Sequence, residues 1–234
     1  MQTKNTANKE EIEKFNKLAE EWWNPKGKFA PLHKFNPVRQ EYLVNEISNQ
    51  FSLNLDQEKP FKNLDILDVG CGGGLLCEPL NRLGANVTGI DAAKTNIEVA
   101  KIHMKQNGLN IKYINITPEE IKDQKFDVIL CMEIIEHVED VNFFIKELER
   151  VSSKGYIELP TSLEDNLVFE NKKDHLWHID FDDDENKLLI SKKQNYFDPI
   201  LTVSTIKKLQ KYFRKSLVIE LYWENEINYS LIEK

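Results

Sequence analysis

The sequence has few cysteines, no excess of positive charge and no long apolar run. Its cysteines, Cys71, Cys77 and Cys131, form no C-x-x-C pair, which argues against a thiolate metal site, and no secretory signal precedes them. We therefore expect a reducing, cytoplasmic location. No apolar run approaches the roughly eighteen residues that span a bilayer, so any membrane contact is expected to be peripheral, on the inner face.

Length and charge narrow the class further. The chain has 234 residues, which suits one α/β domain with some additions. Its formal net charge of −8 argues against unspecific nucleic-acid binding, because neutralising phosphates requires clustered cations. We therefore expect a small-molecule partner and no nucleic acid.

Glycines are concentrated at one place. An alternating apolar stretch, residues 64 to 69, runs directly into Gly70, Gly72, Gly73 and Gly74. Glycine can take positive φ and lets a ligand approach the backbone without meeting a Cβ. A helix starting at Leu75 would point its free N–H groups at that ligand. Asp91 ends the next apolar run, at the offset where a carboxylate accepts hydrogen bonds from a ribose.

Two cofactor classes use such a loop. The dinucleotide fingerprint G-x-G-x-x-G requires a glycine where this chain has Leu75. The spacing of Gly70, Gly72 and Gly74 after Asp68 instead resembles motif I of the class I S-adenosylmethionine-dependent methyltransferases. S-adenosylmethionine is the cofactor that this resemblance implies, and a nicotinamide or flavin cofactor or a vestigial loop is the alternative.

Hydrophobic periodicity predicts the order of elements. Helices are expected over residues 9 to 23 and around residues 38 to 47, giving an N-terminal helical extension, 1–60, before a cofactor-binding domain, 61–234. Within that domain we expect strands at 64–69, 86–90, 111–115, 126–132 and 155–159, and helices at 75–83, 93–106 and 141–150. A capping box at 117–120 opens a short helix. This alternation predicts an α/β, Rossmann-like fold with a mostly parallel sheet and helices on both faces.

The last third of the chain has a different character, with the change near residue 150. Residues 175–181 and 187–193 predict a β-hairpin insertion after strand five, around an acidic turn. A helix at 202–213 and a strand at 217–223 are expected to complete the sheet.

Further motifs resemble one family. Trp22-Trp23, the run from Pro31 to Arg39 and the run from Cys131 to Val138 are similar to motifs of the ubiquinone-biosynthesis O-methyltransferases. The resemblance covers about residues 10 to 150 and implies methylation of a phenolic oxygen on a polyprenylated, catechol-like ring. Because the chain after Arg150 departs from the family pattern, another small-molecule or lipid-linked acceptor is the alternative.

The resemblance also implies a cofactor site made of Arg39, Gly70, Gly72, Gly74, Asp91 and Met132. Met132 would lie against the adenosine at the end of strand four, and Arg39 would come from the N-terminal extension. The alternative for Arg39 is a surface ion pair, and for Met132 it is ordinary core filling.

A mixed cluster follows Met132. Glu133, Glu136 and His137 stand at i, i+3 and i+4, so they share one face if they lie on a helical turn. In the family such a turn holds a divalent cation, usually Mg²⁺, which a catechol chelates. An acidic first helical turn is the alternative, and His137 is also the candidate catalytic base. His175 and His178 are interpreted as structural, and His33 is a weaker substrate-side candidate.

Overall fold

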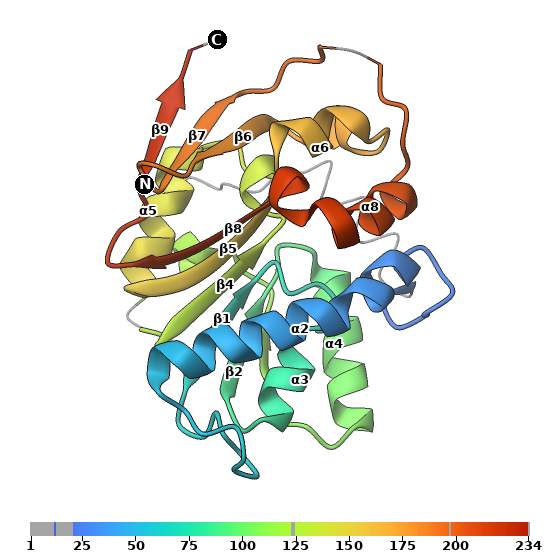
Figure 1. Ribbon diagram of the computed structural model, residues 1–234. Coiled ribbons are helices and arrows are strands. Elements are labelled where there is room, and N and C mark those ends of the chain that lie inside the picture. Colours follow the sequence, from blue (N-terminus) through green and yellow to red (C-terminus); the bar gives the residue numbers. More distant parts are fainter. Residues whose placement is uncertain (1–11, 13–20, 123–124, 197, 234) are drawn as a thin grey trace. The chain divides into compact units, whose positions relative to one another are not determined.

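The computed structural model describes residues 12, 21–122, 125–196 and 198–233, which form an α/β protein (Figure 1). Among these residues one compact unit extends up to Ile129, and a second begins at Leu130. The helix predicted over residues 9 to 23 lies mostly outside the described residues. The division into 1–60 and 61–234 stays a prediction.

The first unit contains the second predicted helix, α2 (Ala30–Phe51). A proline in its first turn is tolerated because the N–H that proline lacks has no helical partner there. On this helix Leu43 and Ile47 are buried, whereas Val38 is exposed. The helix ends at Ser52, which takes a left-handed conformation with φ 52°.

Three parallel strands form the sheet of the first unit, in the order β3-β2-β1. They are β1 (Asp65–Val69), β2 (Asn86–Ile90) and β3 (Lys112–Ile114), connected through α3 (Cys77–Arg82) and α4 (Lys94–Gln106), and β3 is followed by η2 (Pro118–Glu120). The predicted capping box of η2 is present. The helix expected from Leu75 was placed too early. The backbone still turns at Gly74, whose φ is 89°, so the helix begins two residues later than expected.

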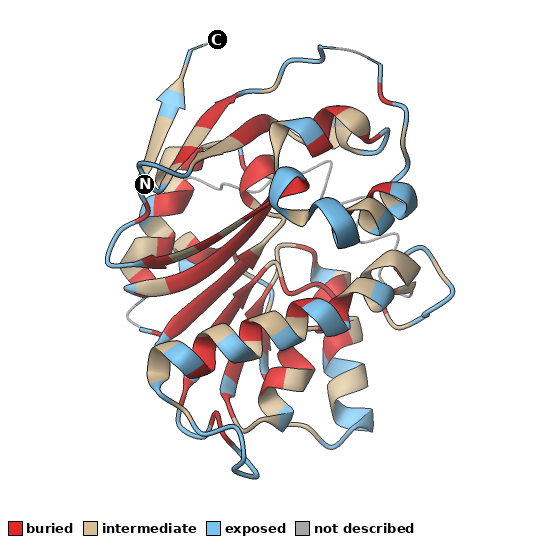
Figure 2. Ribbon diagram, in the orientation of Figure 1, coloured by how far each residue is buried: buried red, intermediate tan, exposed pale blue. Residues whose placement is uncertain are grey.

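The second unit continues the alternation. Its sheet has the order β4-β5-β8, with β8 antiparallel to β5. The elements are β4 (Val128–Met132), which crosses the unit boundary, η3 (Ile135–His137), α5 (Val141–Val151), β5 (Lys154–Pro160), α8 (Val203–Leu217) and β8 (Val218–Glu224). Figure 2 shows that β5 and β8 are mostly buried, whereas α8 presents a long exposed face.

The predicted hairpin is confirmed as β6 (Trp177–Asp182) and β7 (Lys187–Lys192), which pair antiparallel. It belongs to a separate three-stranded sheet, because β9 (Tyr229–Ile232) pairs parallel with β7. The sequence did not predict β9, nor the short helices α6 (Ser162–Leu167) and α7 (Asn171–Asp174). In the described part of the chain no helix is long and apolar enough to span a membrane.

Candidate active site

The glycine loop after β1 has the backbone that its sequence predicts. Gly70, Gly72 and Gly74 have φ values of 72°, 52° and 89°, which a residue with a Cβ adopts only at a cost. The N–H groups of Gly70 and Cys71 both donate to the carbonyl of Ile90, at 2.9 and 3.0 Å. The loop is thereby tied to the carboxyl end of β2, the edge at which parallel α/β sheets bind ligands.

Two tryptophans lie against this loop. A Cβ built on Gly72 would approach the Trp22 ring to 2.4 Å, so glycine is needed for packing as well as for φ. Trp22 Nε1 donates to Asn96 at 2.8 Å, and Trp23 Nε1 donates to the carbonyl of Gly73 at 2.9 Å. The sequence did not predict that Trp22 and Trp23 lie beside the glycines. The nearest signal was the Trp-Trp pair of the family motif.

The carboxylate of Asp91, the expected ribose ligand, is hydrogen-bonded to the glycine loop. One oxygen of its carboxylate accepts from the Gly72 N–H at 2.9 Å. The other accepts from the Ala93 N–H at 2.7 Å and from the Asn96 side chain at 3.2 Å. These contacts fix the carboxylate, half-buried, directly after β2. The structure therefore brings Gly72 and Asp91 together.

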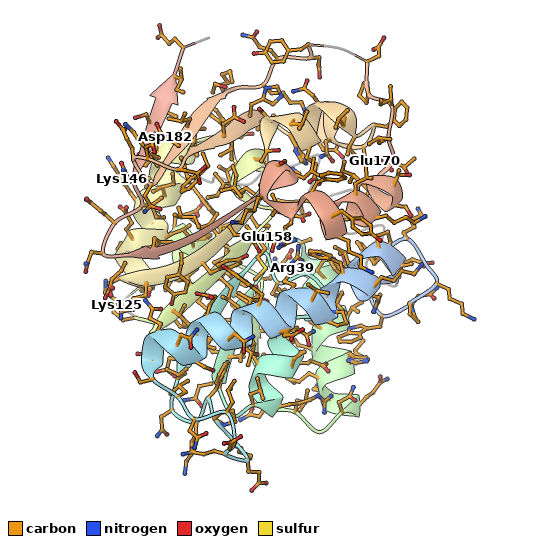
Figure 3. All side chains as sticks on the ribbon, viewed as in Figure 1. Arg39, Lys125, Lys146, Glu158, Glu170 and Asp182 are labelled. Atoms are coloured by element: carbon orange, nitrogen blue, oxygen red, sulfur yellow. The ribbon has the colours of Figure 1, made fainter. Side chains whose placement is uncertain are left out.

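Arg39 is a buried residue of α2, which argues against the alternative of a surface ion pair (Figure 3). Its guanidinium lies 5.1 Å from the centre of the Phe35 ring. The same charge acts on Asp68 at the end of β1. The pKa of Asp68 is raised to about 7, mainly by burial and also by the Asp91 charge, while the Cys77 thiol and Arg39 oppose this rise. The charge of Arg39 therefore acts on Asp68, at the strand end that leads into the glycine loop.

A shallow pocket of about 290 Å³ lies beside α2 and α3. His33 lines it, and its Nε2 contacts the carbonyl of Trp22 at 2.8 Å. Glu78 and His103 also line it and form a contact of 2.7 Å. His33 thus has a structural partner in the Trp22 backbone, and its substrate-side role stays a prediction.

In the second unit Met132 ends β4 and is half-buried. The residue after it departs from expectation, because Glu133 has a φ of 54° and lies outside the helical turn of η3. Its carboxylate binds Lys207 Nζ at 2.7 Å, and its N–H donates to the carbonyl of Glu158. The geometric argument that put Glu133 on one helical face with Glu136 and His137 therefore does not hold.

The structure brings a different set together. One potential ligand atom from each of Glu136, His137 and His175 lies within 4.8 Å of the other two. Glu136 is buried, and the rings of His137 and His175 meet edge to face at 4.6 Å. The sequence interpreted His175 as structural and did not predict that it lies near Glu136 and His137. No local spacing could have found it, because it is 38 residues from His137.

A buried carboxylate stands behind His175. Asp165 contacts His175 Nδ1 at 2.6 Å, His178 Nε2 at 3.0 Å and Lys193 Nζ at 2.8 Å. Burial alone would raise the pKa of Asp165, but its contacts with His175, His178 and Lys193 outweigh burial and lower that pKa well below its usual range. Burial lowers the pKa of His175, opposed by Asp165. The structural interpretation of His178 is consistent with this network.

Comparisons with known proteins agree with this architecture. A family model described as a methyltransferase domain matches residues 67–157. A ubiquinone biosynthesis O-methyltransferase of Pelagibacter ubique is 56% identical over 164 residues, which cover 70% of this chain and 68% of that protein. The protein of the same name from Bartonella tribocorum is 54% identical over 146 residues, covering 62% of this chain and 59% of that protein.

The chain belongs to the family of ubiquinone biosynthesis O-methyltransferases. The resemblance seen in its motifs is confirmed, and so are the class I methyltransferase fold and the S-adenosylmethionine-dependent methyltransferase class. The chain spans less than two thirds of the length of several relatives that it matches, including the one from Bartonella tribocorum. Among solved structures, coclaurine N-methyltransferase with N-methylheliamine and SAH has a TM-score of 0.42 at 16% identity, covering 52% of this chain and 36% of that chain.

Proposed function

We propose that this protein transfers the methyl group of S-adenosylmethionine to a phenolic hydroxyl of a polyprenylated catechol precursor of ubiquinone. The observation that carries the proposal is the positive-φ glycine loop joined to Asp91, in a chain that is 56% identical over 164 residues to a ubiquinone biosynthesis O-methyltransferase. A second function has support in the C-terminal part, whose sequence departs from the family pattern after Arg150. In this second function the methyl acceptor would be another small or lipid-linked molecule.

Methyl transfer from a sulfonium to a phenolate is an in-line displacement. The oxygen forms a bond to the methyl carbon, the carbon–sulfur bond breaks, and the two opposite charges disappear. The protein must position both reactants, exclude water and remove the phenolic proton. We assign donor binding to Gly70, Gly72, Gly74 and Asp91, with Arg39 and Met132 as further contacts.

His137 is the proposed proton acceptor. Its Nδ1 lies 3.1 Å from the carbonyl of Asp174, and a carbonyl can only accept, so Nδ1 carries the proton. The lone pair is then on Nε2, where a neutral imidazole can take a proton near neutral pH. The carbonyl of Asp174 thus sets the tautomer that a base requires.

A divalent cation is the alternative way to activate the phenol, and Mg²⁺ is the ion that the sequence predicted. When bound, such an ion lowers the pKa of a coordinated phenol. Of the three predicted ligands, Glu133 already pairs with Lys207. Glu136 and His137 stay close to each other and to His175, and two imidazoles with a carboxylate fit a divalent cation.

The proposed function is tested by transfer of a labelled methyl group to a catechol with a short prenyl tail. We expect turnover with the unchanged chain. Asp91→Ala should weaken binding of S-adenosylhomocysteine about tenfold or more, because it removes the carboxylate beside Gly72. Asp184→Ala, in the exposed β6–β7 turn, is the control and should leave binding unchanged. Transfer only to other acceptors would favour the second function, and tight NAD binding in place of S-adenosylhomocysteine would refute the proposal.

Membrane contact is proposed to be weak and peripheral. The cations Lys26, Lys28, Lys34 and Arg39 lie near Trp22, Trp23 and Phe29 in the sequence and offer only a partial membrane surface. Trp22, Phe29 and Arg39 are buried, and the two aromatic residues belong to one apolar cluster, which reduces this surface further. A better surface is α8, which exposes Tyr212 and Phe213 at 74% and 60% beside Lys208, Lys211 and Lys215.

We therefore predict salt-sensitive binding to vesicles that contain anionic lipid, with short-tailed catechols methylated better than long-tailed ones. A lysine near an anionic surface contributes about 1 kcal/mol, so Lys208→Glu with Lys211→Glu should weaken vesicle binding at least tenfold. Lys101→Glu with Lys105→Glu on α4 is the matched control, since both are exposed and four residues apart. Salt-resistant co-sedimentation, or equal losses in both pairs, would contradict the prediction.

A further inference from the structure

We propose that Asn96 and Trp22 are positioning residues of the cofactor site, which hold the Asp91 carboxylate in the orientation that accepts the hydroxyls of a ribose. Neither residue is among the proposed donor contacts. The inference rests on the proposed function for the role of Asp91. It adds the residues that make the site select a donor with ribose hydroxyls.

A chain of hydrogen bonds within the first unit ends at Asp91. Trp22 Nε1 donates to Asn96 Oδ1 at 2.8 Å, and Asn96 Nδ2 donates to Asp91 Oδ1 at 3.2 Å. Trp22 and Asn96 are both buried, so water does not readily replace either partner. A change at Trp22 therefore reaches Asp91 through one intermediate side chain.

The polarity of this chain is fixed by its two ends. An indole N–H can only donate, an ionised carboxylate can only accept, and an amide offers both a donor and an acceptor. Because Trp22 donates to the side-chain oxygen of Asn96, the amide nitrogen faces Asp91. Leucine at this position would remove both bonds, and aspartate would place a second carboxylate beside the first. Asn96 is therefore the residue through which Trp22 acts on Asp91.

Asn96 shares the Asp91 carboxylate with two backbone donors. Asp91 Oδ1 also accepts from the Ala93 N–H at 2.7 Å, and Oδ2 accepts from the Gly72 N–H at 2.9 Å. Asn96 itself lies in the first turn of α4. A carboxylate that is bonded at both oxygens has little freedom to rotate, which lowers the cost of ordering it when a ribose binds.

Packing fixes the position of the Trp22 indole. Its ring stacks on Phe29, with the ring centres 4.0 Å apart and 7° between the planes. A Cβ built on Gly72 or Gly73 would approach the Trp22 side chain to 2.4 or 2.5 Å, so Trp22 occupies the space that these glycines leave. Trp22, Phe29 and Leu75 form one buried cluster. The indole N–H is thereby kept beside Asn96.

The test compares two ligands, S-adenosylhomocysteine and an analogue of it that lacks the 2′- and 3′-hydroxyls of the ribose. Each is titrated calorimetrically into the full chain. Asn96→Leu should weaken binding of S-adenosylhomocysteine about tenfold and binding of the analogue less than about twofold, because the loss acts through the hydroxyls. Asp91→Ala should show the same selectivity with at least as large a loss. A purely structural role of Asn96 would weaken both ligands equally.

Trp22→Phe tests the other end of the chain, because it keeps an aromatic ring and removes the indole N–H. We expect it to weaken S-adenosylhomocysteine about threefold, with the same selectivity against the analogue. Combined with Asn96→Leu it should add no further loss, because both changes break the same chain. Additive losses would overturn the role assigned to Trp22.

Asn86→Leu is the matched control. Asn86 Nδ2 also donates to an aspartate, Asp65 Oδ1, at 3.1 Å, but at an exposed site where β2 begins. This change should leave the affinities for both ligands unchanged. Thermal melts establish that each variant is folded, and Trp22→Phe decides the question if Asn96→Leu is not.

The inference alone is overturned if Asp91→Ala discriminates between the two ligands while Asn96→Leu weakens both equally or neither. If Asp91→Ala does not discriminate, both the inference and the assignment of Asp91 to donor binding are overturned. The expected binding pattern without methyl transfer to a catechol would support the inference and count against the proposed acceptor.

Discussion

Replacement of Gly72 by alanine is expected to weaken binding of S-adenosylhomocysteine about a hundredfold or more. The backbone at Gly72 has a φ of 52°, which costs an L-residue about 1–2 kcal/mol. The new Cβ would also lie 2.4 Å from the Trp22 ring, and such overpacking costs about 1–3 kcal/mol. Relief requires the loop or Trp22 to move, which displaces the N–H that Gly72 donates to Asp91. Calorimetric titration measures the effect.

Gly108→Ala is the control, because it introduces a Cβ at a positive φ without overpacking. Gly108 also has a positive φ, 64°, but a Cβ there would meet nothing within 4 Å. We expect this variant to lose about 1–2 kcal/mol of stability and to bind the ligand as the unchanged chain does. Equal affinities for both variants would show that the loop after β1 does not form the cofactor site.

Replacement of Arg214 by methionine is expected to lower the free energy of unfolding by about 3–5 kcal/mol. Arg214 bonds Glu158 on β5 at 2.8 Å and Glu220 on β8 at 2.6 Å, and these two carboxylates face each other across the strand pair. The Glu158 side chain is 1% exposed. Without the guanidinium, a buried carboxylate faces a like charge, and the single hydroxyl proton of Tyr156 can be donated to only one of the two carboxylates at a time.

Arg82→Met is the matched control. Arg82 reaches Glu78 at 3.4 Å from a side chain that is 51% exposed, so its loss should cost less than about 1 kcal/mol. Denaturant unfolding followed by circular dichroism compares the two variants. A loss as small for Arg214→Met as for Arg82→Met would show that water already screens the cluster at Glu158.

The alternating elements up to β5 were predictable because each depends on local pattern. A strand buried on both faces is a continuous apolar run, as in β4, and β1 is an alternating apolar stretch that ends at the glycines. Positive φ in the loop after β1 requires glycine, and the capping box of η2 needs only Thr117 and Glu120. The same locality explains the failures, since α6, α7 and β9 are short segments stabilised by contacts distant in sequence.

The candidate site also has a part that the sequence predicted and a part that it did not. The sequence by itself determined the fold class and the family, and it brought Gly72 and Asp91 together, because a strand, a turn and the next strand end at one edge of a parallel sheet. Only the tertiary structure decided that Glu133 pairs with Lys207 and that His175 joins Glu136 and His137. The physical reason is chain connectivity. Periodicity determines which neighbours within a turn or strand share a face. His175 reaches η3 only after α5, β5, α6 and α7, and Lys207 reaches Glu133 only after the β6–β7 hairpin as well.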